Sequence, residues 1–83
     1  MEEAKLIYTF RKNATDEIRV RTVKYSNSEM VDIRVFVEKP TGEKIPTSKG
    51  ISFSASKLPD FARGIRLLKE HFKVDEDINY LGT

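Results

Sequence analysis

Two stretches decide the fold: IRVRTVKY at residues 18–25 and VDIRVFV at residues 31–37. Successive side chains of a strand point to opposite faces, so each stretch separates into two sets of side chains. One set is aliphatic, and the other carries cations and rings, namely Arg19, Arg21, Tyr25, Arg34 and Phe36. A sheet built from these stretches has a face that can bind phosphates and stack on bases, as single-stranded nucleic acid requires. A solvated face of arginines lying over the rings is the alternative interpretation.

Turn signals on both sides of these stretches predict four strands, at about residues 5–11, 17–25, 30–38 and 43–53. In the first strand, alternation places Leu6, Tyr8 and Phe10 on one face. The third strand leads into Lys39-Pro40-Thr41-Gly42, which fits a type I turn and predicts a hairpin. Pro46 has no N–H to donate to a ladder, so the fourth strand is expected to be an edge or to contain a bulge there.

An apolar stripe after the strands predicts one helix. Its members recur at three- and four-residue intervals: Leu58, Phe61, Ala62, Ile65, Leu68 and Phe72. We expect Ser56 to cap this helix, because Pro59 then occupies the third helical position, where its missing N–H costs nothing. Gly64 costs about 1 kcal/mol relative to alanine, and close approach of another helix is one candidate compensation. The helix is expected to cover one face of the sheet and leave the other in water.

Composition indicates a single domain with a basic sheet region. We take all 83 residues as one domain, with a core at about residues 5–72 and an acidic tail at 73–83. The formal net charge is +2, but residues 4–53 alone hold ten Lys or Arg against six acids. Such an asymmetric distribution is expected of a surface that attracts a polyanion. Because a domain of this size has a modest core, we expect further burial against a second copy.

Other function classes find little support in the chain. No apolar run could cross a bilayer, the Met1-Glu2-Glu3 start lacks the features of a secretory signal, and there is no cysteine. These features predict an intracellular protein of the cytoplasm, nucleoid or nucleus. His71 is the single histidine and has no obvious nucleophile or orienting acid, while residues 75–77 lack the ligand spacing of a calcium loop. We expect no catalysis, no metal and no cofactor.

Four pieces of the strand region share a further pattern: VDIRVFV at 31–37, KPTGE at 39–43, Pro46 and KGISF at 49–53. Together they resemble the central signature of the PC4 (p15) transcriptional coactivator family of single-stranded DNA-binding proteins. The spacing from Arg34 to Ser52 fits without a gap, and the similarity covers about residues 17–72. The resemblance implies a curved antiparallel sheet followed by one helix, a homodimer formed largely through the helices, and single strands or melted duplex bound in grooves of the sheet.

The resemblance also implies roles for individual residues. Tyr25 matches a stacking aromatic, Arg34 matches a phosphate-binding arginine, and Lys49 matches a basic residue of a hairpin that wraps the strand. It further implies that Ser54 caps the helix, in conflict with the local argument for Ser56. The first three assignments agree with the faces expected from alternation.

The chain departs from the family pattern at one stacking position. Val37 stands where the best-known members have a Trp. We expect Phe36, one residue earlier and on the predicted wet face, to supply the missing ring. Arg19, Arg21 and Lys44 are expected to supply charge that the family carries at other positions.

We therefore predict an α+β domain of ββββα order that binds single-stranded nucleic acid, preferentially DNA, as a homodimer with little sequence specificity. The predicted binding site is Arg19, Arg21, Tyr25, Arg34, Phe36, Lys39, Lys44 and Lys49. The predicted dimer interface is Phe61, Ile65 and Leu68. No membrane partner is expected, and a protein of the transcription machinery is a candidate partner. The alternatives are a protein-interaction module, favoured by the missing Trp, and a binder that prefers RNA.

Overall fold

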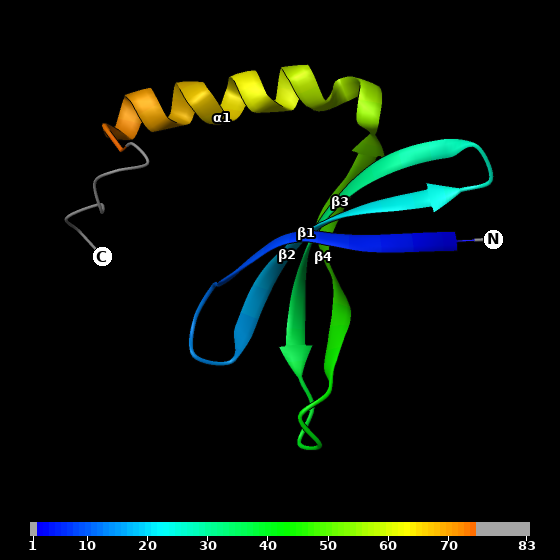
Figure 1. Cartoon of the computed structure of the whole chain (residues 1–83). Coiled ribbons are helices and arrows are strands. Elements are labelled where there is room, and N and C mark those ends of the chain that lie inside the picture. The colour runs from blue at the N-terminus through cyan, green and yellow to red at the C-terminus, as the bar shows by residue number, and fades with distance from the viewer. Residues whose placement is uncertain (1, 75–83) are drawn as a thin grey trace.

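The computed structural model describes residues 2–74 and shows four strands followed by one helix (Figure 1). The elements are β1 (Glu2–Arg11), β2 (Asp16–Tyr25), β3 (Ser28–Glu38), β4 (Lys44–Ser54), a 3-10 turn (Ala55–Lys57) and α1 (Leu58–Phe72). The strands form one open antiparallel sheet in the order β1-β2-β3-β4, which confirms the predicted ββββα architecture. In residues 2–74 no helix is long and apolar enough to cross a membrane. The acidic tail predicted for residues 73–83 lies, beyond Val74, outside the described residues.

The register of β2 against β3 creates two chemically different faces. Arg21 lies opposite Asp32, and opposite residues of an antiparallel pair project from the same face. One face, here called the basic face, carries Glu17, Arg19, Arg21, Val23, Tyr25, Met30, Asp32, Arg34 and Phe36. The other, the aliphatic face, carries Ile18, Val20, Val31, Ile33, Val35 and Val37. The separation predicted for these two strands is therefore confirmed.

The first strand breaks the simple alternation. Its register against β2 shifts between Leu6 and Tyr8, so the residue between them forms a bulge. Leu6 lies opposite Arg21 of the basic face, whereas Tyr8 lies opposite Val20 of the aliphatic face. The prediction that Leu6 shares a face with Tyr8 and Phe10 is wrong, because one inserted residue reverses the facing of everything on one side of it.

The fourth strand contains the irregularity expected at Pro46. Gly50 lies opposite Arg34 and Pro46 lies opposite Phe36, so residues 47–49 bulge out against a single residue of β3. Because proline cannot donate to the ladder, the interruption costs no hydrogen bond at that position. The sequence-based expectation of a bulge or an edge is confirmed.

Two features hold this bulge against β3. The side chain of Thr47 donates a hydrogen bond from Oγ1 to the carbonyl oxygen of Val35 over 2.9 Å. Gly50 then brings the backbones of β3 and β4 unusually close. A Cβ at this position would lie 2.5 Å from the carbonyl oxygen of Ile33 and 2.8 Å from Cα of Arg34. Only glycine fits there without a backbone shift.

The connection between β3 and β4 is a tight turn. The N–H of Gly42 donates to the carbonyl of Lys39 over 2.8 Å, as in a β-turn. Gly42 has a φ of 93°, a conformation that glycine adopts without steric cost. The hairpin predicted at Lys39-Pro40-Thr41-Gly42 is confirmed.

The helix begins differently from the local expectation. Ser54 caps the 3-10 turn by accepting a hydrogen bond from the N–H of Ser56 over 3.3 Å. The α-helix itself starts at Leu58 after Lys57, which makes no side-chain capping bond, and Pro59 lies in its first turn. The prediction of Ser56 as the cap is therefore wrong. The inserted 3-10 turn lets Ser54 cap the segment while Pro59 stays where its missing N–H is harmless.

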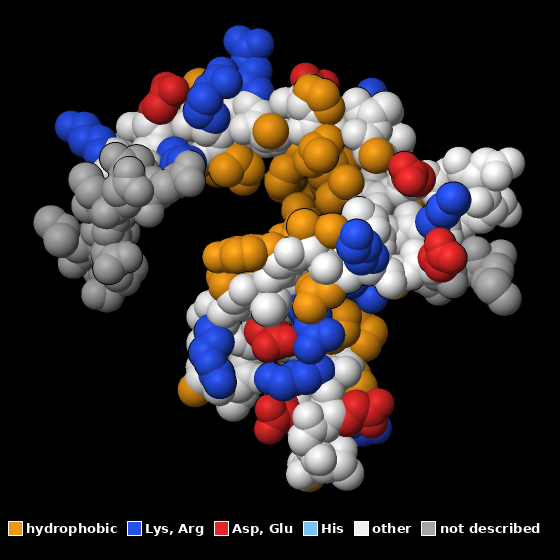
Figure 2. Space-filling model, viewed as in Figure 1, with side chains coloured by type: hydrophobic (Ala, Val, Ile, Leu, Met, Phe, Trp, Pro, Cys, Tyr) orange, Lys and Arg blue, Asp and Glu red, His pale blue; other side chains and the backbone are white. Residues whose placement is uncertain are grey.

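The helix extends away from the sheet instead of lying on it (Figure 1). It contacts β4 through Phe61, whose ring centroid is 5.0 Å from that of Phe53. No residue of α1 is buried, and Ile65, Leu68 and Phe72 are 43%, 53% and 53% exposed. The prediction that the helix covers a face of its own sheet is wrong, because the 3-10 turn follows β4 directly and leaves no loop to fold the helix back. Hydrophobic side chains gather around the space between the sheet and the helix (Figure 2).

Candidate nucleic-acid interface

A buried carboxylate occupies the centre of the basic face. Asp32 of β3 is 3% exposed. Arg21 on β2 donates from Nε to Oδ2 over 2.8 Å, and Ser52 on β4 donates from Oγ to Oδ1 over 2.5 Å. Arg34 donates to Oδ1 from Nη2 over 2.9 Å and from Nε over 3.1 Å. The register explains this arrangement, because Asp32 lies opposite Arg21 on one side and opposite Ser52 on the other.

These partners keep Asp32 charged. Burial opposes its ionisation, but hydrogen bonds from Arg34, Ser52 and Arg21 outweigh burial and hold the pKa of the carboxyl below its ordinary value. A buried carboxylate is tolerated when its oxygens are fully hydrogen-bonded to cations. Asp32 therefore joins three strands and offsets part of the positive charge of the basic face.

The ring of Phe36 lies beneath two arginines. The guanidinium carbons of Arg19 and Arg21 are 4.5 and 5.2 Å from its centroid, and Phe36 is 5% exposed. The expectation that this ring faces solvent is wrong, although it does lie on the basic face. Arginines two residues apart on β2 reach across to the neighbouring strand and cover the ring through cation–π contacts. Phe36 thus supports the two guanidinium groups.

A second acid pairs with the cations at the far end of the face. Arg19 Nε donates to Glu17 Oε1 over 2.6 Å, and Lys44 Nζ lies 3.4 Å from Glu17 Oε2 and 3.2 Å from Glu38 Oε1. The hydrogen bond from Arg19, with a smaller effect of Lys44, lowers the pKa of Glu17. Figure 2 shows acidic side chains among the basic ones of the sheet. Among the described residues, no group of His, Asp or Glu is arranged to hold a metal ion.

Arg34 has a structural contact in addition to Asp32. Its Nη1 donates to the carbonyl oxygen of Thr47 over 3.0 Å, and its side chain is 19% exposed. The same guanidinium therefore fastens the β4 bulge to β3 and remains partly open to solvent. Arg34, a predicted binding residue, is therefore also part of the structure that holds β3 and β4 together.

Tyr25 lies at the end of β2, beside a hollow in the basic face. Tyr25 is 53% exposed. The hollow has a volume of about 170 Å³ and is lined by Arg21, Val23, Tyr25, Met30, Asp32, Arg34 and Ser52. The prediction that Tyr25 and Arg34 share one face is therefore confirmed, and the apolar side chains of Val23 and Met30 line the same hollow.

Residues 12–63 match the family model described as Transcriptional Coactivator p15 (PC4). The chain belongs to the PC4 family. It is similar to the PC4 homologue BPSL1147 of Burkholderia pseudomallei. With the orthorhombic crystal form, the identity is 32% and the TM-score 0.74, over 80% of this chain and 89% of that one. With the tetragonal form, the identity is 31% and the TM-score 0.74, and the match covers 81% of this chain and 98% of that one.

A more distant structure shows the same fold. The PC4 homologue of bacteriophage T5, implicated in recombination-dependent DNA replication, has 16% identity and a TM-score of 0.58, over 84% of this chain and 80% of that one. A comparison with curated proteins gives no match. Membership of the PC4 family supports a nucleic-acid-binding role for this chain.

Two of the predicted site residues lie at the margin of the arginine cluster of this PC4-family sheet. Lys39 is in the turn and forms an ion pair with Glu43 over 3.7 Å. Lys49 lines a second hollow, of about 330 Å³, together with Arg34, Lys12 and residues of the aliphatic face such as Ile33. The structure therefore brings together Arg19, Arg21, Tyr25, Arg34, Phe36 and Lys44. Lys49 adjoins this group at Arg34, and Lys39 lies apart from it.

Sequence reasoning missed the acids and the hydroxyl that organise the site. Glu17 and Asp32 alternate with the arginines and fall on the same face by the same rule, so alternation could have found them. Ser52 enters the sequence pattern only as the end of the family spacing from Arg34, whereas the structure shows that its hydroxyl donates to Asp32. Lys12 gave no signal beyond its charge.

Proposed function

We propose that this PC4-family protein binds single-stranded DNA with little sequence preference, as a homodimer. The observation that carries the proposal is the hollow on the basic face, where an exposed tyrosine adjoins two arginines. A base stacks on Tyr25 while neighbouring phosphates pair with Arg21 and the accessible part of Arg34. Stacking and phosphate pairing are the two contacts that sequence-tolerant binding of single strands uses.

The guanidinium groups leave suitable donors for phosphate. Arg19 and Arg21 each use Nε for the intramolecular bond, to Glu17 and Asp32 respectively. Among the described residues, neither arginine donates a hydrogen bond from a terminal nitrogen. Since a guanidinium has five N–H donors, each arginine can bind its carboxylate and a phosphate together.

The polar groups of the hollow explain the expected lack of sequence preference. Asp32 accepts from Arg21, Arg34 and Ser52, so its oxygens are already occupied. Sequence is read through hydrogen bonds to base edges, and phosphate contacts carry no such information. A hollow whose central acceptor is satisfied internally favours stacking over base readout.

Fluorescence anisotropy of labelled oligo-dT at several salt concentrations tests the proposal. We expect log K to fall against log salt with a slope of about −0.7 for each phosphate contacted. Unlabelled RNA of equal length and duplex DNA serve as competitors, and stronger competition by RNA would identify an RNA-preferring binder instead. The proposal is contradicted if the protein does not bind oligo-dT at low salt, or if the binding constant does not change with salt concentration.

Replacing Tyr25 by alanine should weaken oligo-dT binding about 5- to 150-fold, because stacking on an aromatic contributes about 1–3 kcal/mol per base. The salt slope should remain nearly unchanged, since no cation is removed. Tyr25→Phe keeps the ring and is the matched control, expected to bind within about twofold of the wild type. Equal loss in both variants would show that stacking is not the contact.

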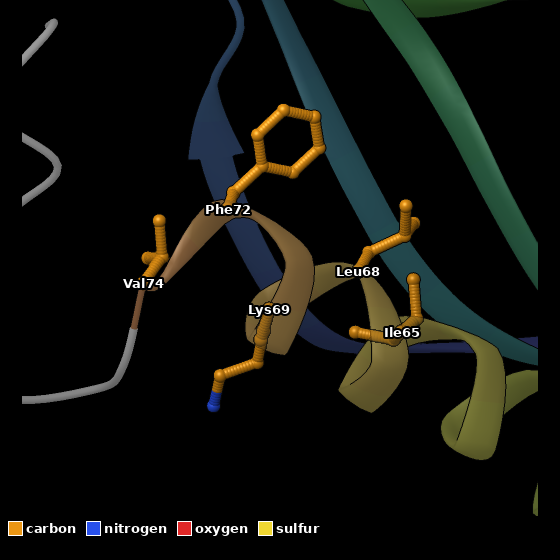
Figure 3. A pocket seen from close by; sticks show the side chains of 5 residues that line it. All are labelled: Ile65, Leu68, Lys69, Phe72 and Val74. Carbon is orange, nitrogen blue, oxygen red and sulfur yellow. The ribbon is translucent and has the colours of Figure 1, made fainter.

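The homodimer is supported by apolar surface on α1 that the described part of the chain leaves exposed. Ile65, Leu68 and Phe72, with Lys69 and Val74, line an apolar hollow of about 420 Å³ on α1 (Figure 3). Phe61 already contacts Phe53, so the predicted interface residues that remain open are Ile65 and Leu68. Exposed apolar surface of this kind marks an interaction site, and the small core of the sheet leaves the domain in need of it.

Leu68→Asp should shift the protein from dimer to monomer in sedimentation velocity, because a charge would be placed within the apolar contact. Leu67→Asp is the matched control: Leu67 is 52% exposed, like Leu68 at 53%, but lies off the stripe. We expect this control to remain dimeric. A wild-type protein that sediments as a monomer at all concentrations would refute the homodimer.

A protein-interaction module is the second candidate function. It is favoured by the pairing of the basic face with its own acids, namely Glu17, Asp32 and Glu38. If this alternative holds, the apolar stripe of α1 binds another protein and oligo-dT neither binds nor competes.

A role in transcription regulation, with a partner from the transcription machinery, is part of our proposal and is tested by adding the protein to a reconstituted transcription reaction.

A further inference from the structure

Asp32 and Phe36 together restrain the arginines of the basic face. The carboxylate engages the Nε of Arg21 at 2.8 Å and both Nε and Nη2 of Arg34 at 3.1 and 2.9 Å. The ring of Phe36 lies under the guanidinium of Arg21 at 5.2 Å. Asp32 and Phe36 are buried, at 3% and 5% exposure, so both restraints come from beneath the surface on which a ligand would lie.

This restraint lowers the conformational entropy that the arginine side chains lose when they bind phosphate. A free arginine side chain has many rotamers and loses that freedom when it binds a phosphate. A guanidinium that is already held in place loses less, and each pre-ordered side chain strengthens binding by roughly 2- to 12-fold. The Nε edge of Arg21 is held from below, whereas its terminal nitrogens are left for the ligand.

We propose that Asp32 is a positioning residue for phosphate binding, acting through Arg21 and Arg34. This inference rests on the proposed function and adds a residue to it that itself repels phosphate. Simple electrostatics predicts the opposite effect of its removal, because a carboxylate near a bound phosphate costs affinity. The sign of the change on neutralising Asp32 therefore distinguishes the two accounts.

The test is Asp32→Asn in the full chain, measured by oligo-dT anisotropy at one low salt concentration. We expect about tenfold weaker binding, despite the gain of one unit of positive charge, because two arginines lose their restraint. Glu29→Gln is the matched control, since Glu29 is an exposed acid on the same strand and pairs in register with Lys24 instead of an arginine. That variant should bind as tightly as the wild type or up to about twofold tighter.

Two further readouts separate positioning from general destabilisation. In a background with Arg21→Gln and Arg34→Gln, Asp32→Asn should change affinity less than about twofold, because the residue acts only through these arginines. In a nitrogen–proton correlation spectrum of the free protein, the Nε–H resonances of Arg21 and Arg34 should be resolved and should be lost in Asp32→Asn. If Asp32→Asn does not fold, Ser52→Ala removes one hydrogen bond to the carboxylate and should weaken binding about two- to threefold.

Each outcome bears on one claim. The positioning role is overturned if Asp32→Asn binds as tightly as the wild type or tighter, or if Ser52→Ala has wild-type affinity. It is also overturned if Asp32→Asn causes an equal loss in the background that carries Arg21→Gln and Arg34→Gln. Wild-type protein that does not bind oligo-dT overturns the proposed function instead, while the Nε–H resonances still report whether Asp32 restrains the arginines.

Discussion

Gly50→Ala is expected to lower the free energy of unfolding by about 3 kcal/mol, the upper range for an overpacked site. The added Cβ would lie 2.5 Å from the carbonyl oxygen of Ile33 and 2.8 Å from Cα of Arg34, and both are backbone atoms that cannot rotate away. Relief requires separating β4 from β3 beside the bulge, where Arg34 joins the two strands. A domain of this size has a total stability of about 4–12 kcal/mol, so the loss is large. Urea unfolding followed by circular dichroism measures it.

Gly42→Ala is the matched control for this prediction. It makes the same chemical change at a position where nothing lies within 4 Å of the added atom. The φ of 93° still disfavours alanine, so we expect a loss of about 1–2 kcal/mol. If the two variants unfold at the same urea concentration, close backbone contact at Gly50 is not what requires a glycine.

The faces of β2 and β3 could be predicted from the sequence because the two strands pair without a register shift. From Arg19 to Tyr25 every second side chain keeps its face, so alternation alone locates the arginines and the tyrosine. The same rule fails in β1, because no proline or glycine near the bulge between Leu6 and Tyr8 indicates that the register shifts there. In β4, by contrast, Pro46 predicts the bulge.

Alternation left open whether the rings of the basic face are exposed or covered by arginines, and at Phe36 the structure shows that the ring is covered. The pattern places Phe36 on the polar face, but its burial depends on arginine side chains long enough to reach it from the next strand. The helix shows the same limit. Its apolar stripe can be recognised in the sequence from the spacing of the residues. That spacing does not determine whether the stripe packs on its own sheet or on another chain. The structure excludes its own sheet for Ile65 and Leu68, which are exposed.

The ion pairs of the basic face and the exposed stripe of α1 both bear on how tightly the protein binds a polyanion. The basic face holds its cations in place with internal acids, so the net charge offered to a polyanion is lower than a count of arginines suggests. A single sheet of this kind presents few phosphate contacts, and affinity for a single strand then gains from a second copy that presents a second sheet. The exposed stripe of α1 is where such a copy would attach. Dimerisation and binding are therefore expected to weaken together in Leu68→Asp.

Arg34→Ala is the second variant expected to have a large effect on stability. It removes the bonds from Nη2 and Nε to Asp32 and the bond from Nη1 to Thr47. Breaking a buried ion pair from one side costs about 3–5 kcal/mol, and since Arg21 and Ser52 still bind the carboxylate we expect about 3 kcal/mol. Arg66→Ala is the control, because its pair with Glu70 on α1 has N and O atoms 4.0 Å apart and is exposed, so its removal should cost less than about 0.5 kcal/mol.

The cost of Arg34→Ala should depend on pH in a direction fixed by Asp32. The folded protein lowers the pKa of this carboxyl, so the stability it contributes is fully present above the unfolded pKa of about 4 and is lost as pH falls through the folded pKa. Removing Arg34 takes away a hydrogen bond that lowers this pKa, so the gap in unfolding free energy between wild type and variant should be widest near pH 7 and narrow below about pH 4. Urea unfolding of both proteins between pH 3 and 7 measures this gap. A gap that stays constant over this range, or widens in acid, would mean that Arg34 stabilises the sheet through the bulge carbonyl of Thr47 and not through Asp32.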